Sequence, residues 1–152
     1  MSDFAFEKDL SVTETGIEGL RVVELSVHGD SRGWFKENWQ RAKMVALGIP
    51  DLHVVQNNVS FNAERGVTRG IHAEPWDKFI SVATGSVFGA WVDLRQGSAT
   101  YGKAYTTTLD PSRAIYVPGA SATPSRRWRT APPTPTSSMP TGLQSSRGPT
   151  PS

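Results

Sequence analysis

The sequence predicts an all-β fold of the sandwich or small-barrel type. Between Leu20 and Val117 the chain consists of short runs rich in β-branched and aromatic residues, separated by turn residues at roughly 8–12-residue spacing. Only one stretch has a helical pattern, and no apolar run approaches the roughly 20 residues of a membrane helix. Many short strands with little helix favour a β-sandwich or a small barrel.

Turn-forming residues bound each predicted element. The run LRVVELSVH (20–28) alternates and forms the first strand, and residues 34–39 extend a second one. Residues 39–49 form the predicted helix, which ends at Gly48 and Pro50. Thr84-Gly85-Ser86 is predicted to be a hairpin turn. Six further strands are predicted at 53–61, 66–74, 78–84, 86–95, 103–110 and 113–118.

Charge and composition divide the chain at Pro118. Residues 119–152 hold four arginines, no acidic residue and 7 of the 11 prolines, mixed with Ser, Thr and Ala. We therefore expect one domain at 1–118, followed by a disordered tail. The domain carries 12 basic and 14 acidic residues, a net charge of −2. The basic character of the whole chain thus belongs to the tail and does not indicate a nucleic-acid partner.

The cysteine count and the N-terminus narrow the class of protein further. The 152 residues include no cysteine, which excludes disulfides, thiolate metal sites and a cysteine nucleophile. The N-terminus, MSDFAFEKDLSVTETG, has acidic residues where a secretory signal needs a basic and then an apolar stretch. We expect a cytoplasmic protein without a membrane segment.

Three polar residues share one face of the predicted strand at 53–61. Gln56, Asn58 and Ser60 have the same parity, so their side chains point to the same side. If that side points inward, it lines a polar cavity; otherwise it is a solvated edge face, which the pattern alone slightly favours.

Arg69 and His72 lie on the next predicted strand and differ by an odd number. An ideal strand sends them to opposite faces, whereas a bulge at Gly70 would bring them together. A lone histidine in a strand is more often a structural residue than a catalyst, so the pattern by itself leaves both roles open for His72.

Five segments occur in an order typical of one enzyme family: DSRGWFKE (30–37), VVQNNVSFN (54–62), RGVTRGIHAEP (65–75), KFISVATGSVFGAWVDLR (78–95) and AIYVP (114–118). Over about residues 18–118 they resemble the dTDP-4-dehydrorhamnose 3,5-epimerases. The resemblance implies a cupin-type jelly roll, a homodimer, and chemistry with neither metal nor organic cofactor. It also implies that the substrate is a dTDP-4-dehydro-6-deoxyhexose, inverted at C3 and C5 on the way to dTDP-L-rhamnose.

The same resemblance implies roles for individual residues. His72 is the base that removes protons made acidic by the C4 ketone, and an imidazole pKa near ~6.5 suits that task at neutral pH. Lys78 stabilises the negative charge on the enolate oxygen. Arg32 faces the nucleotide phosphates, which match its paired donors. The implied substrate-binding residues are Arg32, Phe35, Glu37, Gln56, Asn58 and Arg69.

The chain departs from the family in two places. The loop from His72 to Lys78 is several residues shorter than in most members. After Pro118 the remaining strands, a general-acid tyrosine and a later aspartate have no counterpart. Back-translation of residues 120–139 with permitted codons, read one base earlier, gives GVGNAFQALEDGTAYTYLVN, which resembles the missing strands. We therefore expect a frameshift at codon 119, a chain that folds poorly, and impaired epimerisation; resequencing across that codon tests this.

Three other interpretations remain at this stage. A metal-dependent cupin needs two or three clustered histidines and a carboxylate, whereas His72 has only Glu74 beside it, and His28 and His53 lie in other segments. A non-catalytic remnant would bind dTDP without exchanging hydrogen at C3 or C5. A mono-epimerase would exchange hydrogen at one of the two carbons.

Overall fold

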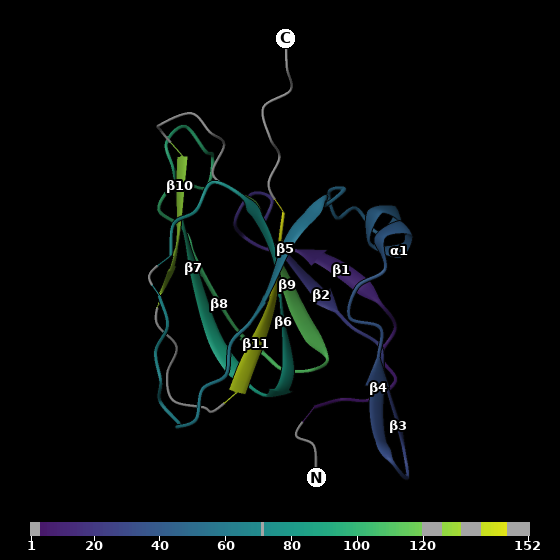
Figure 1. Cartoon of the computed structure of the whole chain (residues 1–152). Helices are drawn as coiled ribbons and strands as arrows, with labels where there is room; N and C mark the ends of the chain where they lie inside the picture. Colours follow the sequence, from purple (N-terminus) through teal and green to yellow (C-terminus); the bar gives the residue numbers. More distant parts are fainter. Residues whose placement is uncertain (1–3, 71, 120–125, 132–137, 146–152) are drawn as a thin grey trace.

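The computed structural model describes residues 4–70, 72–119, 126–131 and 138–145, the last two segments as backbone only. These residues form two larger antiparallel sheets that pack as layers, and a separate hairpin projects beyond them (Figure 1). The first sheet has the order β1 (Ser11–Glu14), β2 (Arg21–Glu24), β9 (Arg113–Val117), β6 (Asp77–Gly85), β11 (Ser138–Ser145), β5 (Val54–Val59). The second has the order β10 (Arg126–Ala131), β7 (Val87–Arg95), β8 (Ala104–Leu109), and the hairpin consists of β3 (Val27–Asp30) and β4 (Gly33–Lys36). The prediction of an all-β fold is confirmed.

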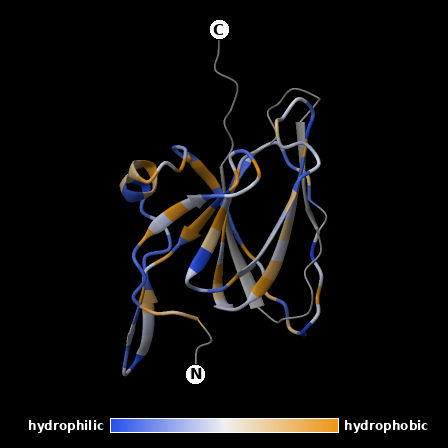
Figure 2. Ribbon diagram, turned by 180° about the vertical axis from the view of Figure 1, so that it is seen from behind, coloured by the Kyte–Doolittle hydropathy of each residue, from blue (hydrophilic) through white to orange (hydrophobic). Residues whose placement is uncertain are grey.

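Alternation along the strands of the larger sheet builds a core on each of its faces. Val82 and Ile115 point into one cluster together with Trp91 of β7, so they fill the space between the two sheets. Phe79 and Tyr116, of opposite parity, point into a second cluster that includes Met44 of the helix. Figure 2 shows hydrophobic stretches recurring along the strands, as this double-sided burial requires.

The predicted helix exists but is shorter than expected. It is α1 (Arg41–Ala46), and the Gln40 side chain caps it by accepting a hydrogen bond of 2.8 Å from the Lys43 N–H. Gly48 adopts φ +92°, a conformation that favours glycine and ends the helix there. Met44, buried in the second cluster, holds α1 against the sheet.

A buried ionic network closes the end of β7. The Asp93 carboxylate is fully buried and accepts hydrogen bonds of 2.9 Å from both Nε and an NH2 group of Arg95. The hydroxyls of Ser98 and Thr100 each donate to it at 2.6 Å. Arg95 also donates to the Glu18 carbonyl at 2.6 Å, which ties the turn after β7 to the N-terminal segment. Burial opposes ionisation of Asp93, but these hydrogen bonds outweigh it and hold the pKa of its carboxyl below its usual range.

Three sequence predictions about local structure are wrong. Residues 84–86 do not form a hairpin turn, because β6 and β7 belong to different sheets and the chain crosses between layers there. The described residues of 66–74 form no strand, since Gly66 (φ +85°) and Gly70 (φ +135°) interrupt the extended backbone. The strand predicted at 20–28 is split into β2 and β3 at Leu25, whose N–H turns to the Ser112 carbonyl at 2.7 Å.

Part of the predicted disordered tail is described as strand. β10 pairs with β7, and β11 lies between β6 and β5, all antiparallel. Such pairing uses backbone groups and does not depend on the composition of the side chains. The expectation of a disordered tail stays a prediction. The other residues of the tail, 120–125, 132–137 and 146–152, lie outside the described residues.

Candidate functional site

Lys78 lies near the start of β6, in the interior of the larger sheet. Its backbone is in register with Val117 of β9 on one side and with Gln144 of β11 on the other. The preceding residue, Asp77, accepts a hydrogen bond of 2.6 Å from the N–H of Gly119. A Cβ at Gly119 would lie 2.5 Å from the Trp76 backbone, so this close approach of the two segments requires glycine. The start of β6 is therefore fixed both by strand pairing with β9 and β11 and by the contact with Gly119.

The half-buried Lys78 ammonium forms an ion pair with the Glu74 carboxylate, four residues earlier. The side chains retain only 15% and 28% of their accessible surface, respectively, so the pair is largely shielded from water. The Lys78 charge is thus partly compensated, and a substrate anion would have to share or displace Glu74. From the sequence, Glu74 is considered only as a metal ligand. Its position four residues before Lys78, with the opposite charge, is the feature that could have indicated this ion pair.

Gln56 and Asn58 lie on the same face of the sheet as Lys78. Gln56 of β5 is in register with Gln144 of β11, which is in register with Lys78. These three positions therefore form one row across adjacent strands, the polar row. Residues opposite one another in antiparallel strands point to the same side, and two strand spacings put Gln56 and Lys78 about 10 Å apart. Ile80, of the same parity as Lys78, packs against the cluster between the sheets. This face is therefore the inner one.

The Gln56 amide donates a hydrogen bond of 3.0 Å to the Asn58 side chain, which confirms that the two share a face. Both residues are exposed, as is the whole of β5. Of the two alternatives that the sequence left open, the structure agrees with the solvated edge face: Gln56 and Asn58 lie on the side of the sheet that Lys78 shares, but on an exposed edge strand that lines no enclosed cavity.

His72 and Arg69 lie on the long connection between β5 and β6, and both are exposed. The Arg69 guanidinium donates to the Asn62 side chain at 2.6 Å and to the Phe61 carbonyl at 3.1 Å, which folds the connection back on the end of β5. His72 is two residues from Glu74, the ion-pair partner of Lys78. The chain thus carries His72 toward the same end of β6 along an irregular connection, without the strand predicted at 66–74.

Arg32, Phe35 and Glu37 belong to the β3–β4 hairpin and its exit, not to the polar row. The Arg32 guanidinium, with 88% of its side chain exposed, pairs with Asp30 in the hairpin turn. Phe35 keeps 71% of its surface exposed, and Glu37 pairs with Lys43 at 2.8 Å. Figure 1 shows the hairpin projecting beyond the two sheets, so a single chain presents these residues apart from Lys78.

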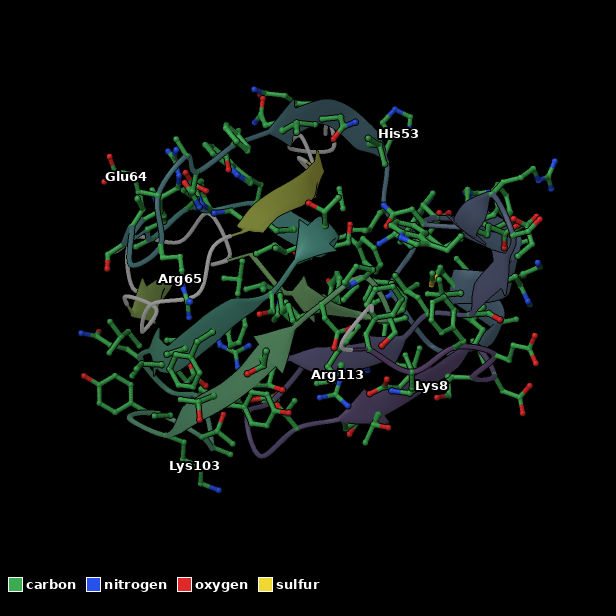
Figure 3. All side chains as sticks on the ribbon, turned by 90° about the horizontal axis from the view of Figure 1, so that it is seen from below. Lys8, His53, Glu64, Arg65, Lys103 and Arg113 are labelled. Carbon is green, nitrogen blue, oxygen red and sulfur yellow. The ribbon has the colours of Figure 1, made fainter. Side chains whose placement is uncertain are left out.

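The described residues contain no group of three or more His, Asp or Glu side chains placed to hold a metal ion. The chain has two histidines besides His72, and one of them, His53, points outward from the chain just before β5 (Figure 3). None of the helices in the described ranges is long and apolar enough to cross a membrane.

A sequence model of the dTDP-4-dehydrorhamnose 3,5-epimerase family matches residues 14–124, nearly three quarters of the chain. The chain belongs to this family. Solved structures show a similar fold: RmlC from Streptococcus suis in complex with dTDP-D-xylose matches with a TM-score of 0.79 and 41% sequence identity, and the match covers 95% of this chain and 73% of that one. This likeness confirms the cupin-type fold.

Members of the epimerase family with similar sequences include the "Protein RmlC homolog" of Streptococcus pyogenes serotype M6. It is 49% identical over 124 residues, which are 78% of this chain and 62% of the relative. The dTDP-4-dehydrorhamnose 3,5-epimerase of Methanothermobacter thermautotrophicus is 36% identical over 106 residues, 68% of this chain and 53% of the relative. The chain thus matches between half and two thirds of the length of these two relatives.

Proposed function

We propose that this chain acts on C3 and C5 of dTDP-4-dehydro-6-deoxy-D-glucose, as the epimerase that forms dTDP-4-dehydro-L-rhamnose. The observation that supports this most is the row of Gln56, Gln144 and Lys78 on the inner face of the sheet. Along this row, the Gln56 amide is available to a sugar and the Lys78 ammonium to a developing anion on the same side of the sheet. The related RmlC from Legionella pneumophila has been solved in complex with dTDP-4-keto-L-rhamnose, a ligand of this chemical class.

The proposed reaction starts with proton transfer to His72. The C4 ketone acidifies the hydrogens at C3 and C5, and removal of either by the imidazole leaves an enolate. The Lys78 ammonium stabilises the oxyanion at C4 and exchanges part of its interaction with Glu74 for it. Arg69 contributes positive charge nearby, while Gln56 and Asn58 bind the sugar.

The nucleotide is assigned to the β3–β4 hairpin. The exposed Arg32 guanidinium offers paired donors to the diphosphate, and Phe35 offers an apolar ring surface. Glu37 completes the substrate-binding set at the exit of the hairpin.

Net inversion requires that a proton return on the opposite face of the sugar. Residues 119–152 contain no tyrosine and no acidic residue, so they supply neither the acid nor the aspartate expected of the family. We therefore propose that this chain exchanges hydrogen through His72 but completes inversion poorly.

Incubation with substrate in D₂O tests the proposed function directly. We expect deuterium at C3 and C5, read by position in the proton NMR spectrum, and little dTDP-4-dehydro-L-rhamnose. Binding of dTDP without any incorporation would favour the non-catalytic remnant. Fast net inversion by the chain would contradict the proposed impairment.

A mono-epimerase is the second candidate. A dTDP-4-dehydrorhamnose 3-epimerase of Streptomyces niveus is 38% identical over 109 residues, 67% of this chain. Deuterium confined to C3 in the same assay would favour this activity.

We further propose a cytoplasmic homodimer whose interface includes the outer face of β5. Val55 and Val59, of opposite parity to Gln56, are 57% and 63% exposed, and Phe61 is 62% exposed just beyond them. Apolar side chains repeated along the outer face of an edge strand are typical of a surface covered by a partner. A second copy would also bring a second hairpin to the polar row.

Lysine at Val59 is expected to convert the dimer to a monomer, because it places a charge in the centre of this apolar face. Light scattering after size exclusion measures the molar mass. Thr106→Lys, at an exposed position of β8, is the control and should leave the dimer intact. A Val59→Lys protein with unchanged molar mass would contradict the proposed interface.

A further inference from the structure

The β3–β4 hairpin makes a two-stranded sheet of its own, and among the described strands its two strands are in register with each other alone. One backbone hydrogen bond, donated by the Glu7 N–H to the Val27 carbonyl at 2.8 Å, joins it to the N-terminal segment, and side chains of β4 make further contacts. Successive residues of β4 point to opposite sides: Phe35 faces outward, whereas Trp34 and Lys36 share the other face. Trp34 packs edge-on against Phe4, with ring centroids 6.0 Å apart, which joins the hairpin to the N-terminal segment.

Lys36 joins the hairpin to the two-layered body of the protein. Its ammonium donates to the Val82 carbonyl at 2.7 Å and to the Pro111 carbonyl at 3.1 Å. Val82 is a buried residue of β6, and Pro111 is a buried residue of the turn between β8 and β9. One half-buried side chain thus connects β4 with two segments that lie 46 and 75 residues further along the chain.

We propose that Lys36 is a positioning residue, which fixes the β3–β4 hairpin relative to β6 and so sets where Arg32 and Phe35 meet the nucleotide. The inference rests on the proposed function. β6 also carries Lys78, so the contact of Lys36 with Val82 links the hairpin to the strand of the candidate catalytic lysine.

Burial and hydrogen-bond geometry support a positional role. Burial lowers the pKa of Lys36 to about 8, against the opposing effect of the Asp110 charge, so the fold places this cation where solvation is poor. A lysine that served only solubility would extend into water, as Lys103 does at the rim of the molecule (Figure 3). A hairpin held in its binding position before the nucleotide arrives loses less conformational freedom on binding.

The test compares Lys36→Met, which keeps the apolar stem, with Lys36→Arg, which keeps a charged donor, and with Lys103→Met as the control. Amide hydrogen exchange of residues 27–36 reports the hairpin, and calorimetry with dTDP reports binding. In Lys36→Met we expect hairpin amides to exchange about tenfold faster while those of β7 are unchanged. The Kd for dTDP should rise about tenfold, with deuterium incorporation at saturating substrate within about twofold of wild type.

Lys36→Arg should keep hairpin amide exchange and the Kd for dTDP close to their wild-type values, and Lys103→Met should alter neither. Unchanged hairpin exchange in Lys36→Met, or a loosened hairpin with a wild-type Kd, would overturn the proposal. A wild-type chain that does not bind dTDP would instead contradict the proposed function, while the exchange data would still decide whether Lys36 holds the hairpin. Should Lys36→Met not fold, Lys36→Gln, which keeps a shorter neutral donor, provides the same comparison.

Discussion

Asparagine in place of His72 is expected to reduce deuterium incorporation at C3 and C5 by about 10²-fold to 10⁴-fold, the usual contribution of a positioned general base. Asparagine is close to histidine in size and polarity but cannot accept a proton at neutral pH. Because His72 is exposed on the connection before β6, its replacement should leave the cores and the stability of the fold intact. Incorporation is followed by proton NMR in D₂O at saturating substrate.

His53→Asn is the matched control, since His53 is also exposed but points outward ahead of β5 (Figure 3). Its rate should equal that of the wild type. Affinity for dTDP should be retained in both variants, because Arg32 and Phe35 are untouched. Undiminished incorporation in His72→Asn would show that another group is the base. Repeating the comparison in a variant gene read from codon 119 in the alternative frame proposed from the sequence tests whether the effect extends to net epimerisation.

The face of the polar row could be predicted in part from the sequence. Parity alone placed Gln56 and Asn58 on one side of a strand, and their side-chain hydrogen bond confirms it. Parity could not say which side was inward, because that depends on the register of β5 with β11 and of β11 with β6. Register is set by partners distant in the chain, so local pattern does not encode it.

Long-range contacts account for the other differences. The alternation of 66–74 favours a strand, but the positive φ angles of Gly66 and Gly70 and the bonds of Arg69 to Asn62 and Phe61 shape an irregular connection. Lys36 is an ordinary lysine in the sequence, and only the folded chain brings it to the Val82 carbonyl.

Asparagine at Asp93 is expected to lower the free energy of unfolding by about 3–5 kcal/mol, the usual effect of breaking a buried ion pair. The variant leaves the Arg95 guanidinium, only 6% exposed, without an anionic partner. It also turns an acceptor of two hydroxyl and two guanidinium donors into an amide that is partly a donor itself. Since domains of this size are stable by about 5–15 kcal/mol, a large share of the stability would be lost. Urea denaturation followed by tryptophan fluorescence measures it.

Asp9→Asn, at an exposed position, is the control and should change the free energy of unfolding by less than about 0.5 kcal/mol. The pH dependence provides an independent check. The pKa of Asp93 is lower in the folded than in the unfolded chain, so the unfolded chain binds the proton first as the pH falls. The contribution of Asp93 is therefore complete above the ordinary carboxyl pKa of about 4 and is lost below it. The difference between wild type and Asp93→Asn should be constant near neutrality and shrink in acid, whereas a purely steric defect would give the same difference at every pH.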